Sequence, residues 1–173
     1  EHGLRSMLVV RHGKLVFERY WNGSDANTLQ DTMSVTKSIT SMLLGIAIDR
    51  GLVGGLGEPM MKTLAVPYPE LAERHREVTL EHLLLMQSGV DCDDQRPGTA
   101  VGHAAKMVRG QDRLRVFLEL PRLHRPGTVT AYCSGDALAL GRVIELASGQ
   151  RLPQFAQQHL WAPLGITHAQ WGS

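Results

Sequence analysis

Ser34 and Lys37 are two residues whose types and spacing could do chemistry together. They lie near the start of MSVTKSITSMLLGIAIDRG, a segment from Met33 to Gly51 in which apolar residues recur at helical spacing. Residues three positions apart lie on the same side of a helix, so the serine hydroxyl and the lysine amine can meet. An alcohol becomes a good nucleophile when a nearby base takes its proton. The pair is therefore either a nucleophile with its base or a helix cap beside a solvated lysine.

The beginning of a helix favours this chemistry. A lysine at its ordinary pKa of about 10.4 is charged and cannot act as a base. Burial and the partial positive charge of a helix N-terminus both disfavour the ammonium, and the same charge favours an oxyanion at Ser34. The backbone N–H of Ser34 could donate to the oxyanion of a substrate, since a helix leaves it unpaired. Ser-x-x-Lys occurs once in the chain, and we take Ser34 and Lys37 as candidate catalytic residues.

A second group of candidates is Tyr132-Cys133-Ser134, which lies between an extended stretch and the start of a helix. The phenol of Tyr132 could pass a proton between nucleophile and leaving group if Lys37 favours its phenolate. The alternative is that Tyr132 is a half-buried packing residue and Ser134 a helix cap. Tyr20 fits a similar but looser pattern at a strand end, and Cys133 has no histidine visibly paired with it.

The chain has two cysteines, Cys92 and Cys133, which lack the CxxC spacing of zinc and redox sites. Two cysteines are too few for a disulfide framework, so we expect both to be plain packing residues. The eight histidines include no HExxH motif and no pair four residues apart. We therefore expect no metal site.

Composition describes an ordinary globular chain. Its 173 residues fit one domain of about 100–200 residues, with 43% hydrophobic and 20% charged residues. A net charge of +1 with scattered Lys and Arg gives no support to nucleic-acid binding. No apolar run approaches the roughly 20 residues of a membrane-spanning helix, and no signal peptide or lipidation motif is visible. Both a periplasmic and a cytoplasmic location stay open.

The order of expected elements is two strands followed by helices. Residues 6–21 hold two β-rich runs around His12-Gly13, which predicts a hairpin. Residues 52–69 are rich in Gly and Pro and should be mostly irregular. Further helices are expected at 80–87 after a Thr79 cap, at 112–120, at 135–147 between a Ser134 cap and Gly149, and at 151–161, with a surface excursion at 90–110 and an extended stretch at 128–134. A hairpin alone is too small a sheet for so many helices.

Four motifs occur in an order and spacing that resemble those of a known family. They are SVTKS, VTLEHLLLMQSGV, PGTVTAYCSGDALALGRVIELASGQ and LWAPLGI. The chain resembles the serine β-lactamase and penicillin-binding-protein superfamily, in its class C β-lactamase-like branch of esterases, D-aminopeptidases and nylon-oligomer hydrolases. The resemblance covers nearly the whole chain.

The resemblance implies an α+β fold of the β-lactamase/transpeptidase type, with residues 1–173 as a single domain. It implies Ser34 as acylated nucleophile, Lys37 as its base partner, Tyr132 as catalytic tyrosine and Ser134 as a substrate-binding residue. It also implies a small-molecule ester or amide substrate and neither a metal nor an organic cofactor.

The family's third motif, a Lys/His-x-Gly strand, should follow beyond Trp171, and the chain ends at Ser173. We therefore expect the N-terminal part of a larger hydrolase, without the C-terminal sheet strands and helix. Such a piece should expose apolar surface and self-associate. The alternative is a catalytically incompetent fragment, or a binding or assembly module.

Overall fold

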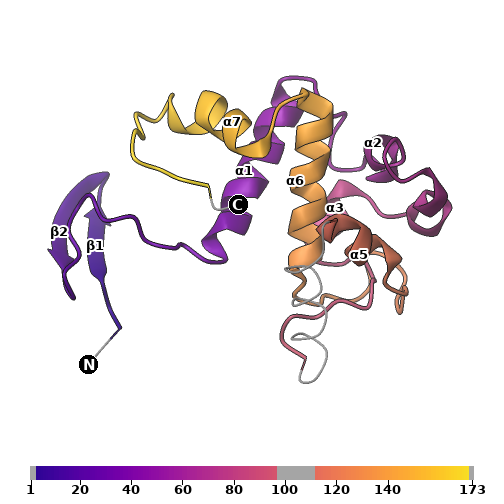
Figure 1. Cartoon of the computed structure of the whole chain (residues 1–173), viewed down its shortest axis with the longest axis horizontal. Coiled ribbons are helices and arrows are strands. Elements are labelled where there is room, and N and C mark those ends of the chain that lie inside the picture. Colours follow the sequence, from indigo (N-terminus) through magenta and orange to yellow (C-terminus); the bar gives the residue numbers. More distant parts are fainter. Residues whose placement is uncertain (1–2, 97–111, 172–173) are drawn as a thin grey trace.

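The computed structural model describes residues 3–96 and 112–171, which form a two-stranded hairpin followed by helices (Figure 1). This is the expected α+β arrangement. Two long helices, α1 (Val35–Asp49) and α6 (Ser134–Ser148), run side by side in the same direction at the centre of the helical part. Their N-terminal ends therefore lie at the same end of the molecule.

The hairpin forms as the sequence predicts. Strand β1 (Ser6–Arg11) pairs antiparallel with β2 (Lys14–Tyr20), and His12 and Gly13 between them both have positive φ, at 50° and 73°. Two such residues are typical of the tight turn that suits strand twist. The hairpin lies apart from the helices (Figure 1), and its large apolar side chains are exposed: Met7, Leu8, Val9, Val10, Leu15, Val16 and Phe17. Within the described residues, no element covers this sheet.

The core lies between the helices. The buried apolar face of α1 consists of Leu43, Leu44 and Ala47, and α6 contributes Ala139, Leu140, Val143 and Ile144. Phe117 and Phe155, the two largest fully buried side chains, come from α5 (Arg113–Glu119) and α7 (Leu152–Ala156). Each helix thus turns one apolar stripe inward, as the 3.6-residue period predicts.

Several expected boundaries shift. Residues 52–69 are not wholly irregular, because Met61–Leu64 form the short helix α2 around the buried side chains of Met60, Met61 and Leu64. Helix α3 (Leu80–Leu84) starts after the expected Thr79 cap but ends three residues early. Two short 3₁₀ turns, Pro69–Leu71 and Glu73–His75, precede it. Helix α7 continues into a π-helical turn, Gln157–Trp161.

The expectation that Ser134 caps α6 is wrong. Ser134 is the first residue of the helix, and Cys133 is the cap, with its Sγ accepting a hydrogen bond from the backbone N–H of Gly135. Gly149 ends the helix as expected, in the left-handed conformation at φ 69°. The surface excursion expected at 90–110 falls mostly outside the described residues.

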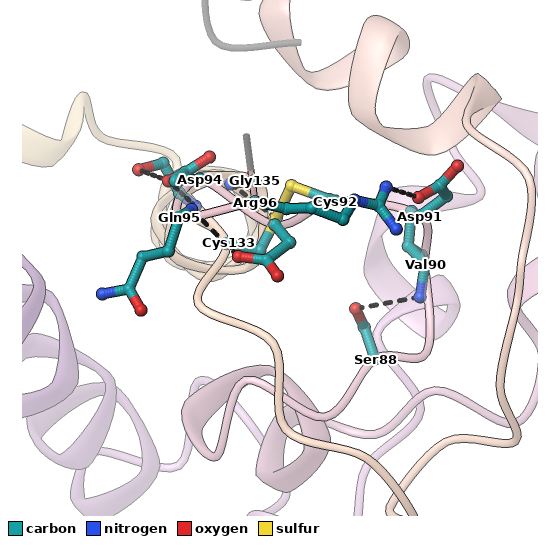
Figure 2. Close-up of a disulfide and its surroundings, with 11 residues drawn as sticks. Ser88, Val90, Asp91, Cys92, Asp94, Gln95, Arg96, Cys133 and Gly135 are labelled. Atoms are coloured by element: carbon teal, nitrogen blue, oxygen red, sulfur yellow. Dashed lines mark hydrogen bonds and ion pairs between the residues drawn. A yellow bond between two sulfur atoms is a disulfide. The ribbon is translucent and has the colours of Figure 1, made fainter. Parts of the chain in front are cut away.

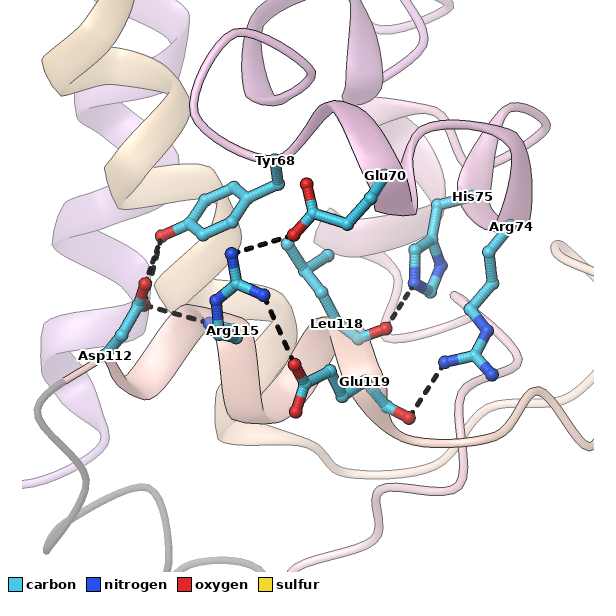
Figure 3. A network of polar contacts seen from close by, with 8 residues as sticks. All are labelled: Tyr68, Glu70, Arg74, His75, Asp112, Arg115, Leu118 and Glu119. Carbon is cyan, nitrogen blue, oxygen red and sulfur yellow. Dashed lines mark hydrogen bonds and ion pairs between the residues drawn. The ribbon is translucent and has the colours of Figure 1, made fainter.

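Polar contacts fasten α5 to the segment that follows α2 (Figure 3). The Tyr68 hydroxyl donates to the Asp112 carboxylate at 3.0 Å, and Arg115 pairs with Glu70 at 2.7 Å. His75 is fully buried and bonds the carbonyl oxygen of Leu118 at 2.8 Å through Nε2. Burial lowers the pKa of His75, so the ring is neutral at pH 7. These contacts hold α5 against the segment that follows α2. No helix in the described parts of the chain is both long and apolar enough to span a membrane.

Gly135 provides a test of this packing. A Cβ built there would lie 2.2 Å from Cδ2 of the buried Phe117, whereas one at the exposed Gly45 of α1 would meet nothing within 4 Å. Gly135→Ala should lower the free energy of unfolding by about 1–3 kcal/mol through overpacking. Gly45→Ala should raise it by up to about 1 kcal/mol, because alanine favours a helix. Urea denaturation of both variants measures the difference, and equal effects of the two substitutions would contradict this packing.

Candidate active site

Ser34 immediately precedes α1, and its side chain makes no capping hydrogen bond. The next backbone N–H groups, of Val35 and Thr36, are already bonded to the carbonyl oxygens of Thr32 and Met33. Met33 has a φ of 49°, unusual for a residue other than glycine, and its N–H donates to the Asp31 carboxylate at 2.8 Å. This sharp turn leaves the Ser34 hydroxyl free of the helix. The N–H of Ser34 makes no hydrogen bond to any described residue.

The structure brings Ser34, Lys37 and Tyr132 together. Lys37 Nζ donates to Ser34 Oγ at 3.1 Å, as the three-residue spacing predicts. The same Nζ lies 4.9 Å from the centre of the Tyr132 ring, where a cation attracts an aromatic face. Ser34 is exposed, whereas Lys37 and Tyr132 are half-buried. Tyr20 is not part of this group, because its hydroxyl donates to Glu18 on the hairpin.

Tyr132 is electrostatically suited to hold negative charge. Hydrogen bonding to Ser34 lowers the pKa of the Tyr132 phenol below its ordinary value, and the Lys37 amine lowers it further. Partial burial and the Asp94 carboxylate act in the opposite direction, but the lowering causes prevail. At a given pH a larger fraction of Tyr132 is therefore phenolate, the form that can accept a proton, than of a free tyrosine.

Ser134 lies beside this group but is engaged elsewhere. Its backbone N–H and its Oγ both donate to the same oxygen of the Asp94 carboxylate, at 2.8 Å and 2.6 Å. Asp94 is a residue that the sequence analysis missed. A carboxylate that binds the first N–H of a helix also interacts favourably with the positive end of the helix dipole. Nothing in the spacing of Asp94 and Ser134, forty residues apart, could have paired them.

The expectation that both cysteines are packing residues is wrong. Cys92 and Cys133 form a disulfide, with their Cα atoms 5.4 Å apart (Figure 2). The bridge joins the segment before the undescribed residues 97–111 to the residue between Tyr132 and Ser134. Two cysteines do not make a multi-bridge framework, but a single bridge needs only the tertiary contact that brings their Cβ atoms together.

Asp136, in the first turn of α6, is the second acidic residue that the sequence analysis missed. It is fully buried, and neither carboxylate oxygen makes a well-formed hydrogen bond within the described residues. Burial raises the pKa of Asp136 to about 7, although polar groups of Ser88 nearby offset part of the rise. This carboxyl is therefore partly protonated at neutral pH.

A cavity of about 660 Å³ opens between α1 and α6 beside the site. Its lining includes Lys37 and Ser134 together with Tyr68, Arg142 and Trp171. It is large enough for a small organic molecule. Among residues 3–96 and 112–171, no three His, Cys, Asp or Glu side chains gather as metal ligands.

Residues 3–173 match the family model described as Beta-lactamase. The chain belongs to the β-lactamase family. It is 33% identical over 149 residues to the Monacolin J acid methylbutanoyltransferase of Aspergillus terreus, covering 78% of this chain and 36% of that protein. It is 29% identical over 157 residues to the Lovastatin esterase of Penicillium rubens, covering 79% of this chain and 38% of that protein.

Solved structures agree with this family in fold. The D-alanine Carboxypeptidase AmpC of Burkholderia cenocepacia superposes with a TM-score of 0.71 at 24% identity, covering 95% of this chain and 44% of that one. The chain spans about two-fifths of the length of the curated relatives it matches. The chain is thus a member of the β-lactamase family, and its relatives are named as an esterase, acyltransferases and carboxypeptidases.

The lowered pKa of Tyr132 can be measured against the other tyrosines of the chain. Hydrogen bonding to Glu18 raises the pKa of Tyr20, and burial raises that of Tyr68. We expect the lowest tyrosine ionisation, seen by ultraviolet absorbance, to fall below pH 10 and to disappear in Tyr132→Phe. Lys37→Met should move it to higher pH, because the phenolate loses a neighbouring cation. A lowest step that survives in Tyr132→Phe would belong to another residue.

Asp136 should make stability depend on pH. Its pKa is raised above that of the unfolded chain, so its stabilising contribution is complete below about pH 4 and is lost as pH rises towards about 7. A shift of about 3 units corresponds to roughly 4 kcal/mol. Relative to Asp136→Asn, the free energy of unfolding of the wild type should fall by up to that amount between pH 4.5 and 7.5. Parallel pH profiles in urea denaturation would mean that Asp136 is ionised throughout.

Proposed function

We propose that this chain carries the nucleophile of a serine hydrolase that cleaves an ester or amide bond through an acyl-enzyme on Ser34. The observation that supports this most directly is the contact of Lys37 Nζ with both the Ser34 hydroxyl and the Tyr132 ring. A nucleophile needs a proton acceptor within hydrogen-bond reach, and we assign that role to Tyr132, with Lys37 as the cation that favours its phenolate. Membership of the β-lactamase family agrees with the assignment.

In the acylation step, the proton of Ser34 Oγ passes to the Tyr132 oxygen while Oγ bonds to the carbonyl carbon of the substrate. Lys37 stabilises the phenolate beforehand and holds the Ser34 oxygen in line. The tetrahedral oxyanion forms beside the unpaired N–H of Ser34, which donates to it.

In the second half of the step, the C–O or C–N bond of the substrate breaks, and the leaving alcohol or amine takes the proton from Tyr132. Water or another acceptor then attacks the acyl group on Ser34, giving its proton to Tyr132 as it does so. The free product leaves when Oγ regains a proton. We assign the cavity lined by Lys37 and Ser134 to one side of a small-molecule ester or amide substrate. No metal or organic cofactor takes part in this scheme.

The alternative is a catalytically incompetent β-lactamase-like chain that serves as a binding or assembly module. The exposed apolar hairpin favours it, because such a surface also supports self-association. Preservation of the Ser34–Lys37–Tyr132 contacts favours the hydrolase.

Covalent labelling tests the nucleophile. A fluorophosphonate probe should label the wild-type protein and fail to label Ser34→Ala, because the probe needs an activated serine oxygen. Ser41→Ala is a matched control, since Ser41 is an exposed serine two turns further along the same face of α1. It should label like the wild type. Mass spectrometry of the labelled peptide locates the adduct, and equal labelling of wild type and Ser34→Ala would remove Ser34 from the mechanism.

Turnover of nitrocefin, p-nitrophenyl butyrate and a D-alanyl-D-alanine peptide by the intact protein separates the substrate classes. Tyr132→Phe should lower kcat on the preferred substrate by about a hundredfold or more, because proton transfer is lost. Labelling without turnover of any of the three would favour a hydrolase of other specificity. Absence of both would favour the module.

A further inference from the structure

Cys92 and Asp94 belong to one short segment, residues 91–94, and between them contact Tyr132, Cys133 and Ser134. Figure 2 shows the disulfide between this segment and Cys133. The backbone N–H of Asp94 donates to the carbonyl oxygen of Tyr132 at 2.7 Å. The Asp94 carboxylate accepts from the backbone N–H and the hydroxyl of Ser134. Between these two points, Cys133 is covalently joined to Cys92. One segment therefore contacts three consecutive residues through a backbone hydrogen bond, a disulfide and hydrogen bonds to a carboxylate.

These contacts engage the backbone and the short side chains and leave the Tyr132 phenol facing Ser34 and Lys37. Residues 128–133 form neither helix nor strand, so no regular hydrogen-bond ladder sets their position. On their other side, the backbone N–H of Ala131 donates to the carbonyl oxygen of Met86 at 3.0 Å. A slip of one residue in an extended chain moves side chains by roughly 3.5 Å, which would take the phenol out of reach of Ser34.

We propose that Asp94 and the Cys92–Cys133 disulfide together form a positioning clamp that holds the Tyr132 phenol beside Ser34 and Lys37. The inference rests on the proposed function, since it assigns how the proton-transfer group of that site is kept in place. Asp94 and the two cysteines touch neither substrate nor the reacting atoms in this scheme and act through Tyr132 and Ser134. Both sulfur-bearing residues are almost fully buried, at 2% and 1% exposure, so the bridge belongs to the interior of the site.

The charge of Asp94 and the position that its contacts impose on Tyr132 change the pKa of Tyr132 in opposite directions. This difference makes the clamp testable. The Asp94 carboxylate raises the pKa of Tyr132 through its charge, whereas contact with Ser34 and Lys37 lowers it. Loss of the charge alone would therefore lower the pKa of Tyr132. Loss of position would raise it towards the value of a free phenol, because Tyr132 would leave Ser34 and Lys37.

The first experiment compares three variants of the intact protein: Asp94→Ala, Asp94→Asn and Asp93→Ala. Asp93 is the matched control, because its carboxylate accepts from the Gln95 N–H within its own turn at 2.9 Å. The pKa of Tyr132 is measured in each background as the absorbance difference from the corresponding Tyr132→Phe protein. The pH profiles of kcat and kcat/KM are measured with the best chromogenic ester.

Asp94→Ala should raise the pKa of Tyr132 and lower kcat about tenfold to a hundredfold, with KM changed less than about threefold. The ascending limb of kcat/KM should move to higher pH with the phenol. Asp94→Asn keeps an oxygen that accepts from Ser134 and should restore most of kcat, and Asp93→Ala should behave as the wild type. A folded Asp94→Ala protein with an unchanged or lowered Tyr132 pKa overturns the clamp. Normal turnover by Tyr132→Phe would instead overturn the catalytic role of Tyr132.

The second experiment reduces the Cys92–Cys133 disulfide in the wild-type protein. It tests the clamp even if Asp94→Ala does not fold. Dithiothreitol gives two electrons and two protons to the disulfide, leaving thiols on Cys92 and Cys133 and a cyclic disulfide in the reagent. Alkylation and mass spectrometry confirm complete reduction. We expect kcat to fall about tenfold or more and to return on reoxidation, with the helical circular dichroism unchanged. Cys92→Ser should start at the lower rate and not respond to the reagent.

Full activity and an unchanged Tyr132 pKa after complete reduction would overturn the role of the bridge. A loss of activity that accompanies loss of the helical signal would also count against it, because the bridge would then support the whole fold and not the tyrosine.

Discussion

The parallel packing of α1 against α6 is the constraint on which the site depends. Because the two helices run in the same direction, their N-termini lie at one end, and Ser34 and Tyr132 each precede one of them. Two positive helix ends then act on the same small region. That field favours a phenolate on Tyr132 and an oxyanion near Ser34. The Lys37–Ser34 contact follows from the first turn of α1, but the contact with Tyr132 follows from this packing.

Two acidic residues, Asp94 and Asp136, also lie at this end of the molecule, and their surroundings differ. Asp94 binds the start of α6 through Ser134 and keeps hydrogen-bond partners for one of its oxygens. Asp136 lies in the first turn of the helix, fully buried, and burial raises its pKa to about 7. A charge at Asp94 therefore supports the helix start, while Asp136 favours its neutral form. The pKa of Tyr132 is lowered by its Ser34 and Lys37 neighbours, whose effect outweighs that of the Asp94 carboxylate.

The hairpin differs from the helical part in how much of its apolar surface is exposed. Its two strands have every central side chain exposed, including large apolar ones, while the helical part has a closed core of its own. A two-stranded sheet is marginal by itself. The chain spans about two-fifths of the length of its curated relatives.

The sequence by itself determined the features that depend on interactions between residues close together in the chain. The hairpin turn at His12-Gly13, the helical period of α1, the Thr79 cap, the Gly149 stop and the reach of Lys37 to Ser34 all depend on residues within a few positions of one another. The family followed from four such local motifs in order. Helix α2 was missed because its formation depends on buried neighbours and not on its Gly- and Pro-rich surroundings.

Tertiary structure alone decided the contacts that span long separations. Cys92 and Cys133 are 41 positions apart, and no local signal distinguishes a buried thiol from half of a disulfide until the fold brings the two Cβ atoms together. The same holds for Asp94 with Ser134, for Lys37 with the Tyr132 ring and for the burial that raises the pKa of Asp136. Spacing along a helix is fixed by its 1.5 Å rise, whereas the meeting of two helix ends depends on how their apolar faces pack.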